Sequence, residues 1–225
     1  MLADLHMHTL HSWDCTTSID DLLDAALAAG LGALAVTDHN TIAGGVEARA
    51  RAIERGLPLH VVVGSELKTA AEGEIIGLFL HDEIPRGLSF GETLDRIRAQ
   101  SGVVYVPHPF DRFHTTPGEA VLREHAGSID VLETANARLW LERDNRRAER
   151  FAREHRLRRG AGSDAHVPGG IGTGALRLAP FDDPVSFLAA VDGAEIVRTP
   201  RSMLRLQIAK RQRQRSKRPP RKGPT

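Results

Sequence analysis

Short apolar runs alternate with amphipathic segments along most of the chain. The clearest example is the helical pattern IDDLLDAALAA, which follows Ser18 and precedes Gly30 and the strand pattern GALAVT. Ser18 is typical of a helix N-cap with acidic residues in the first turn, and Gly30 fits a left-handed helix end. Alternating strands and helices predict an α/β fold in which the strands form a parallel sheet or barrel.

The same pattern of helices and strands continues as far as residue 162. Ser89 and Glu92 match a capping box, and Gly56 and Gly102 are expected to end helices. The predicted helices cover about residues 43–55, 89–102, 118–125 and 139–155, and the predicted strands about residues 59–64, 75–80, 103–106, 129–133 and those just before Gly162.

Polar and ionisable residues lie where the predicted strands end. In barrels and open α/β sheets these ends share one rim, where active sites are built. We therefore expect residues that are distant in the sequence to meet there. They are His6, His8, Asp38, His39, Glu66, His108, Asn136, Asp164 and His166.

The spacing of these residues indicates metal binding. His6 and His8 are two apart on an extended segment, so both side chains lie on one face and can chelate one ion. Asp164 and His166, in AGSDAH, add one hard oxygen and one imidazole nitrogen. Asp38 is either a further ligand or an outer partner that orients a histidine.

Other histidines carry no such pattern, and we expect them to be surface or packing residues. They are His11, His60, His81, His114, His125 and His155.

Composition adds little beyond a globular class for residues 1–200, which we expect to form one catalytic domain. Hydrophobic residues make up 41% and charged residues 26% of the chain, and no apolar run approaches the roughly 18 residues of a membrane span. The single Cys15 cannot form an internal disulfide, and MLADLHMH lacks a secretory signal pattern. We expect a soluble, cytoplasmic protein without a membrane partner.

Residues 201–225 differ from the rest in charge. They hold ten Lys or Arg and no acid, which leaves 20 basic against 29 acidic residues in the first 200. We expect this tail to be disordered, apart from a short helix over about residues 203–212. It is either a solvated end or a tether to nucleic acid. Clustered cations bind nucleic acid because they displace the counterions around its phosphates.

The ordered motifs DLHMHT, TDHN, GSE, PHP and GSDAH together resemble the PHP (polymerase and histidinol phosphatase) superfamily of metal-dependent phosphoesterases. The resemblance covers about residues 1–175. It implies a distorted seven-stranded, TIM-like (β/α) barrel with a trinuclear metal centre at the strand ends. By position, the implied ligands are His6, His8, Glu66 and Asp164 for one ion, Asp14, His39 and His166 for a second, and Glu66, Glu74 and His108 for a third.

Two positions depart from the family pattern. Glu74 stands where the family often has His, and a carboxylate there favours Mn²⁺, Fe²⁺ or Mg²⁺ over Zn²⁺. The alternative is that the third site is empty. Cys15 stands where Gly is common, next to Asp14. We therefore expect two or three divalent ions, drawn from Mn, Fe, Zn and Mg.

Clustered divalent ions suit phosphate-ester hydrolysis, because they lower the pKa of a bound water and neutralise phosphoryl oxygens. We expect a metal-bound hydroxide as nucleophile, and a nucleotide, an oligonucleotide end or a small phosphorylated metabolite as substrate. Asn136 and Arg138 are predicted to bind substrate, the latter because a guanidinium fork fits phosphate, with Arg112 as a further candidate.

Two other functions remain open at this stage. The first is an amidohydrolase-like enzyme, because the same ions can polarise a carbonyl. The second is a noncatalytic, metal-stabilised module that assists a nucleic-acid enzyme, for which the basic tail is the main argument. The sequence assigns neither the physiological substrate nor an oligomeric state.

Overall fold

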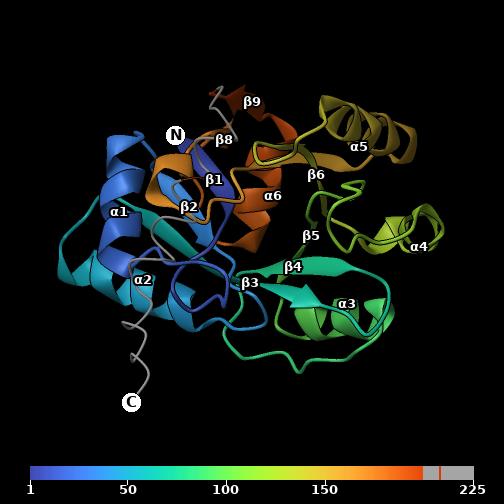
Figure 1. Cartoon of the computed structure of the whole chain (residues 1–225), viewed down its shortest axis with the longest axis horizontal. Helices are drawn as coiled ribbons and strands as arrows, with labels where there is room; N and C mark the ends of the chain where they lie inside the picture. The colour runs from blue at the N-terminus through green and yellow to red at the C-terminus, as the bar shows by residue number, and fades with distance from the viewer. Residues whose placement is uncertain (200–207, 209–225) are drawn as a thin grey trace, which may run out of the picture.

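One curled sheet organises the protein (Figure 1). The computed structural model describes residues 1–199 and 208. Within that part, the sheet has nine strands in the order β7-β6-β5-β4-β3-β2-β1-β8-β9. The strands are β1 (Leu2–Met7), β2 (Ala33–Val36), β3 (His60–Lys68), β4 (Glu74–Leu78), β5 (Val103–Val106), β6 (Val131–Asn136), β7 (Arg158–Gly162), β8 (Gly174–Arg177) and β9 (Glu195–Arg198).

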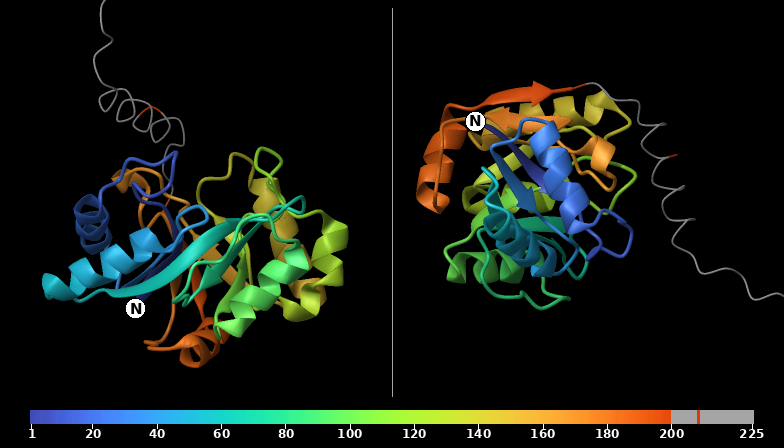
Figure 2. Two further views of the ribbon diagram at one scale, coloured as in Figure 1. Left: turned by 90° about the horizontal axis from the view of Figure 1, so that it is seen from below. Right: turned by 90° about the vertical axis from the view of Figure 1, so that its left-hand side faces the viewer.

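Helices surround the sheet, with α1 and α2 beside the first strands and α3, α4 and α5 beside the later ones (Figures 1 and 2). Their bounds are α1 (Ile19–Ala28), α2 (Ala43–Glu54), α3 (Phe90–Ala99), α4 (Glu119–Glu124), α5 (Glu142–His155) and α6 (Pro184–Asp192), with short 3-10 turns at Ala126–Ser128 and Pro168–Gly170. No helix of the described residues is long and apolar enough to cross a membrane.

The strand directions confirm the α/β class, with one departure from a parallel arrangement among β1 to β7. Strands β1, β2 and β3 are parallel, as are β5, β6 and β7, but β4 is antiparallel to both of its neighbours. The link between β3 and β4 spans only residues 69–73, too few for the crossover that a parallel pair needs. As a consequence, the start of β4, rather than its end, lies at the rim where the other strands end.

The sheet nearly closes into the expected barrel. Just after β7, the Asp164 amide donates to the carbonyl of His6 at 2.8 Å, and the His8 amide donates to the carbonyl of Ala165 at 3.0 Å. Strands β1 to β7 therefore form the distorted seven-stranded barrel. The sequence did not predict β8 and β9, which add antiparallel strands beside β1; four-residue strands carry little periodic signal.

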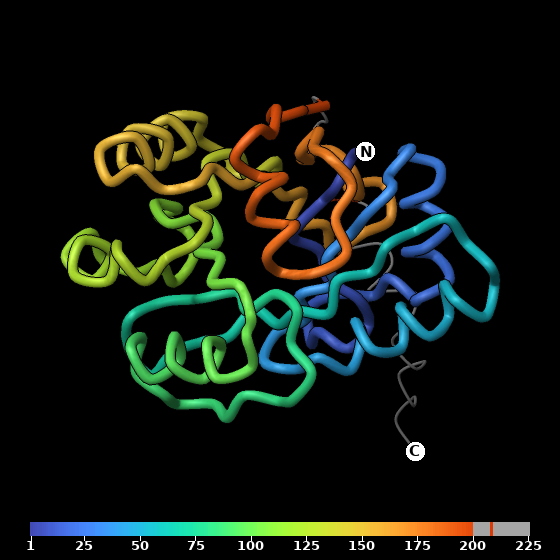
Figure 3. Tube along the Cα trace, turned by 180° about the vertical axis from the view of Figure 1, so that it is seen from behind, coloured from blue at the N-terminus to red at the C-terminus, as the bar shows by residue number. Residues whose placement is uncertain are grey.

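The barrel interior is apolar and closed from behind by α6. Phe187 of α6 belongs to the same buried cluster as Leu5, Ile76, Tyr105 and Val131, which lie on four strands. Figure 3 shows α6, in orange, across the middle of this side of the molecule. The rim opposite α6 is left for polar residues.

Local helix signals are mostly confirmed. The Ser18 hydroxyl accepts from the Asp21 amide, and Ser89 and Glu92 form the expected capping box. Gly30 and Gly56 have φ values of +72° and +60°, as left-handed helix ends require.

Two helix boundaries differ from prediction. The left-handed residue after α3 is Ser101, with φ 57°, not Gly102. Helix α5 begins at Glu142 rather than near residue 139, which leaves the segment before it as a loop. The basic tail and its expected helix lie outside the described residues, except for residue 208.

Candidate metal centre

All nine residues predicted as metal ligands converge at the rim of the barrel. The first group surrounds His6 and His8 at the end of β1. Glu66 Oε1 lies 3.6 Å from His6 Nε2, and Glu66 Oε2 lies 3.5 Å from His8 Nε2. Asp164 Oδ1 lies 3.8 Å and 3.5 Å from the same two nitrogens. The four side chains thus point into one small space from β1, β3 and the end of β7.

The second group lies beside the first. His8, His39 and His166 each offer a ring nitrogen within 4.8 Å of the others. Asp14, in the loop after β1, lies 2.9 Å from His166 Nε2 and 3.5 Å from His39 Nε2. A third group joins Glu66, Glu74 and His108 within the same 4.8 Å limit.

Glu66 is shared between the groups. Its Oε1 lies 3.0 Å from His108 Nε2, and its Oε2 lies 3.1 Å from His39 Nδ1. Glu74 Oε2 lies 4.0 Å from His108 Nε2, and it reaches the rim because β4 runs against its neighbours. One carboxylate therefore contacts all three sets of side chains.

Two of these residues have a left-handed backbone, which is uncommon for residues other than glycine. The φ of Asp164 is 51° and that of His108 is 27°. Such conformations cost about 1–3 kcal/mol each and persist where the surrounding structure enforces them. Here they follow β7 and β5 and turn each side chain toward the centre of the rim.

Glu133 orients the first group and was missed by the sequence analysis. Its carboxylate is fully buried and accepts from His6 Nδ1 at 3.2 Å, Tyr105 Oη at 2.9 Å, the His108 amide at 2.7 Å and Asn136 Nδ2 at 2.9 Å. Because a carboxylate can only accept, the proton of His6 is assigned to Nδ1. The signal was present as the last residue of IDVLE, just before the polar strand end.

A second set of contacts orients His8. Ser12 Oγ donates to Asp38 Oδ1 at 2.6 Å, so it can only accept from His8 Nδ1, at 3.1 Å. Thr9 donates to both Asp38 oxygens, through its amide at 2.7 Å and its hydroxyl at 2.6 Å. Of the two alternatives for Asp38, this geometry favours the outer partner, although it acts on His8 through Ser12, a residue that the sequence analysis did not single out.

Two glycines make room for these carboxylates. A Cβ on Gly162 would lie 2.4 Å from His6 Cβ and 2.5 Å from Glu133 Oε1. A Cβ on Gly44 would lie 2.0 Å from Asp38 Oδ2. Both contacts are far shorter than van der Waals distances, so neither orienting carboxylate could keep its place beside a larger residue.

The donor atoms fit a bound cation. The Nε2 atoms of His6 and His8 lie 3.3 Å apart. Burial opposes protonation of His6, but Asp164, Glu133 and Glu66 raise its pKa well above the usual range. A positive charge between the two nitrogens, from a proton or from a metal ion, is therefore favoured. Imidazole nitrogens and carboxylate oxygens in this arrangement are the ligands that divalent transition metals prefer.

The pKa values of three predicted ligands reflect the negative charge that the clustered carboxylates create. Burial disfavours protonation of His39, but hydrogen bonds with Asp14 and Glu66 raise its pKa to about 10. Burial also disfavours protonation of His108, but Glu66 raises its pKa to about 9. Burial and the charge of Glu66 raise the pKa of Glu74 to about 7. Protons therefore gather where divalent cations would neutralise the carboxylates.

Arg138 lies at the edge of this cluster, and its contact with a substrate phosphate stays a prediction. Its Nη1 donates to Asp164 Oδ1 at 3.0 Å and lies 3.4 Å from His166 Nε2. Asn136 is fully buried, donates to Glu133 and accepts from the Arg138 amide at 2.8 Å. Asn136 thus positions Arg138, and its direct contact with substrate stays a prediction.

Three further residues lie near the candidate metal centre in sequence: Arg112, His114 and Cys15. Arg112 is half exposed and lies 3.6 Å from Asp144, which leaves its role as predicted but not supported by a contact with the cluster. His114 was expected to be a surface or packing residue, yet its ring centroid lies 5.3 Å from that of His108 and its Nδ1 pairs with Asp111. Cys15 Sγ contacts the carbonyls of His8 and His166, both at 3.3 Å.

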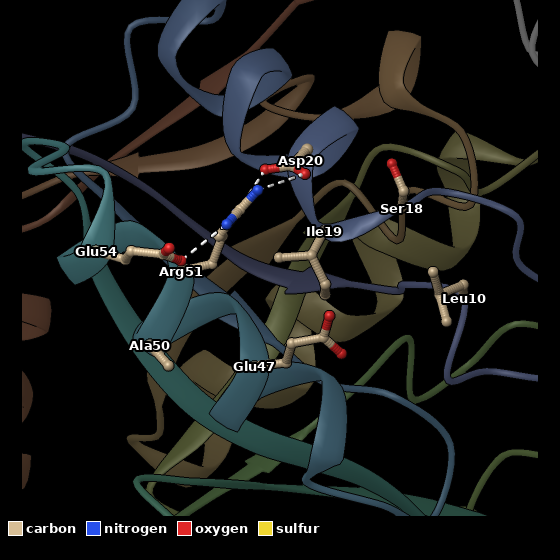
Figure 4. A pocket seen from close by; sticks show the side chains of 8 residues that line it. All are labelled: Leu10, Ser18, Ile19, Asp20, Glu47, Ala50, Arg51 and Glu54. Carbon is tan, nitrogen blue, oxygen red and sulfur yellow. Dashed lines mark hydrogen bonds and ion pairs between the residues drawn. The ribbon is translucent and has the colours of Figure 1, made fainter.

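A separate cavity of about 580 Å³ lies between α1 and α2 (Figure 4). Arg51 crosses it to pair with Asp20 at 3.0 Å and Glu54 at 2.8 Å. None of the nine predicted ligands lines this cavity. This cavity therefore lies apart from the candidate metal centre.

Comparison with known families agrees with this geometry. The family model described as PHP domain matches residues 4–150. The chain belongs to the PHP domain family. A second model, described as PHP-associated, matches residues 142–195, which extends the PHP region of the chain to β9.

Several proteins resemble this PHP chain. Two of them are uncharacterised proteins from Methanocaldococcus jannaschii. The first is 39% identical to this chain over 58% of this chain and 81% of its own length. The second is 32% identical over 81% of this chain and 72% of its own length. A 5′-3′ exoribonuclease from Haemophilus influenzae is 31% identical over 54% of this chain and 47% of its own.

Solved structures share the fold. A two-domain protein from Bacteroides vulgatus, containing a predicted PHP-like metal-dependent phosphoesterase, superposes with a TM-score of 0.70 at 20% identity. The match covers 93% of this chain and 69% of that one. At this identity the likeness establishes the barrel fold.

Proposed function

We propose that this PHP domain is a metal-dependent phosphoesterase that hydrolyses phosphate esters. The observation that carries the proposal is the convergence of five histidines and four carboxylates in overlapping groups that share Glu66. Membership of the PHP family, together with the phosphoesterase named among its structural neighbours, supports a hydrolytic role.

In this proposal the nine residues hold two or three divalent ions. Bound ions would lower the pKa of a water molecule and neutralise phosphoryl oxygens. The ligands are His6, His8, Glu66 and Asp164 for one ion, Asp14, His39 and His166 for a second, and Glu66, Glu74 and His108 for a third. The carboxylate of Glu74 favours Mn²⁺, Fe²⁺ or Mg²⁺ over Zn²⁺ at the third position.

The protein side chains fix the geometry of the reaction. Glu133 and Ser12 hold His6 and His8 with Nε2 toward the centre. Arg138 offers a charged planar donor beside Asp164, where it can bind a substrate phosphate oxygen. The substrate is a nucleotide, an oligonucleotide end or a small phosphorylated metabolite, and the exoribonuclease relative supports the first two.

A substrate panel tests the proposal. Purified protein is loaded separately with Mn²⁺, Fe²⁺, Zn²⁺ and Mg²⁺, its metal content is measured, and it is assayed on phosphate monoesters, phosphodiesters and amides. We expect metal-dependent release of phosphate or nucleotide, abolished by a chelator and restored by metal. Hydrolysis of amides alone would assign the protein to the amidohydrolase-like alternative, and metal binding without hydrolysis would favour the noncatalytic module.

A further inference from the structure

Both tryptophans of the chain are exposed and lie close in sequence to residues of the candidate metal centre. Trp13 is 87% exposed and immediately precedes Asp14, and Trp140 is 54% exposed and follows Arg138 by two residues. Burying an aromatic side chain contributes strongly to folding, so Trp is usually well buried on average. Two exposed tryptophans next to the same centre are therefore not explained by packing within the described fold.

A third exposed aromatic residue lies on the same rim. Phe113 is 65% exposed in the loop after β5, next to Arg112 and His114. Strands β1, β5 and β6 end at one edge of the sheet, and the loops that follow them carry Trp13, Phe113 and Trp140, respectively. Figure 2, left, shows these loops, in blue, green and olive yellow, along one edge. We call these three residues the aromatic rim.

The orientation of Trp13 ties the aromatic rim to the centre. Its ring is stacked against that of His39, with centroids 6.2 Å apart and planes 26° apart. His39 in turn lies 3.5 Å from Asp14. A flat molecule that covers the exposed face of Trp13 would therefore lie on the far side of the indole from His39, one ring away from the second ligand group.

Positive charge follows the aromatic rim along α5. This helix begins two residues after Trp140, and four of its five arginines recur at a spacing of three and four residues, which puts them on one face. All four are exposed to solvent. They are Arg143, Arg146, Arg150 and Arg153. A ligand that contacts both surfaces must combine flat rings with repeated negative charge.

We propose, on the basis of the phosphoesterase function above, that the aromatic rim stacks against unpaired bases of a nucleotide or single-stranded oligonucleotide. The phosphate to be cleaved would lie at the metal centre, and the following phosphates would lie along the arginines of α5. Bases present a flat face that aromatic side chains bind irrespective of sequence. A sugar phosphate offers no such face, so the aromatic rim selects nucleic-acid substrates over small metabolites.

Tryptophan fluorescence gives a direct test, because Trp13 and Trp140 are the two tryptophans of the chain. Metal-loaded, full-length protein is titrated with a single-stranded oligonucleotide whose phosphorothioate linkages resist hydrolysis, and with an abasic oligonucleotide of equal length and charge. We expect the first to quench fluorescence and to bind roughly 5- to 150-fold more tightly, which corresponds to about 1–3 kcal/mol of stacking. Equal affinity for the two ligands, or no binding of either, overturns the proposal.

Variants assign the effect to the aromatic rim. Trp13→Ala and Trp140→Ala should weaken binding of the intact oligonucleotide more than binding of the abasic one, and Trp13→Phe and Trp140→Phe should restore most of the difference. The control is Ile53→Ala on α2, whose side chain is 75% exposed toward the opposite end of the barrel. It should leave both affinities unchanged.

The outcome is separable from that of the proposed function. Equal losses for the intact and abasic ligands would mean that the aromatic rim does not recognise bases and serves another partner, such as a protein surface. Hydrolysis of phosphate monoesters and phosphodiesters that carry no base is measured in parallel with the wild type. Absence of hydrolysis across that whole panel contradicts the phosphoesterase function, whereas failure of base discrimination contradicts only the inference drawn from the aromatic rim.

Discussion

Replacing Glu133 with Gln tests whether contacts outside the ligand set control metal binding. Each carboxylate oxygen of Glu133 accepts two hydrogen bonds, Oε1 from His6 Nδ1 and Tyr105 and Oε2 from the His108 amide and Asn136. The amide NH2 of Gln is a donor and cannot accept from either pair. In every orientation of the new side chain, two buried donors lose their acceptor.

The structure sets the size of the expected effects. An unsatisfied buried polar group costs about 1–3 kcal/mol, so two of them should lower the free energy of unfolding of the metal-free protein by about 2–6 kcal/mol. With Nδ1 of His6 no longer held by a carboxylate, its Nε2 becomes a less basic and less oriented ligand. Loss of such partners weakens metal binding about 10- to 100-fold.

Competition with a fluorescent chelator measures metal affinity, and thermal unfolding measures stability. Tyr105→Phe is the matched control, because it removes one hydrogen bond to Glu133 while keeping the charge and the acceptors. It should reduce metal affinity far less than Glu133→Gln. The reasoning is refuted if the Gln variant folds and binds metal within about twofold of the wild type.

Three further predictions follow from the same centre. His8→Ala or Asp164→Ala should lose metal and most esterase activity, and a fully metallated, active variant would contradict the ligand assignment. Arg138→Ala should lower kcat/KM for phosphate esters about 10- to 100-fold, with Arg138→Lys recovering part of the loss, as for a charged hydrogen bond; equal kinetics for all three proteins would exclude a phosphate contact. Because carboxylates raise the pKa of His39 to about 10 and of His108 to about 9, above the unfolded value near 6.5, the stability that these two histidines give the metal-free protein should be fully present at pH 6.5 and be lost as the pH rises toward 9–10. Its melting temperature should fall as pH rises through 9–10, and a flat or rising profile would contradict the shifts.

The sequence alone predicted the helices and strands up to residue 162 and the residues that meet at the rim of the barrel. Ser18, Ser89 and the helix-ending Gly30 and Gly56 act within a few residues, so their effect can be predicted without knowledge of the fold. The nine predicted ligands converge because the parallel strand ends share one rim, a general property of this fold class. Local patterning did not reveal β8, β9 or the reversed direction of β4.

Only the tertiary structure decided how the predicted ligands are oriented and what surrounds them. Glu133 and Ser12 hold His6 and His8 across sequence separations of 127 and 4 residues, and His114 lies beside His108 through packing. The exposure of Trp13 likewise depends on which neighbours the fold supplies, not on its own identity. Sequence periodicity determines which residues reach the rim, whereas hydrogen bonds and burial between distant segments determine what each of them can do there.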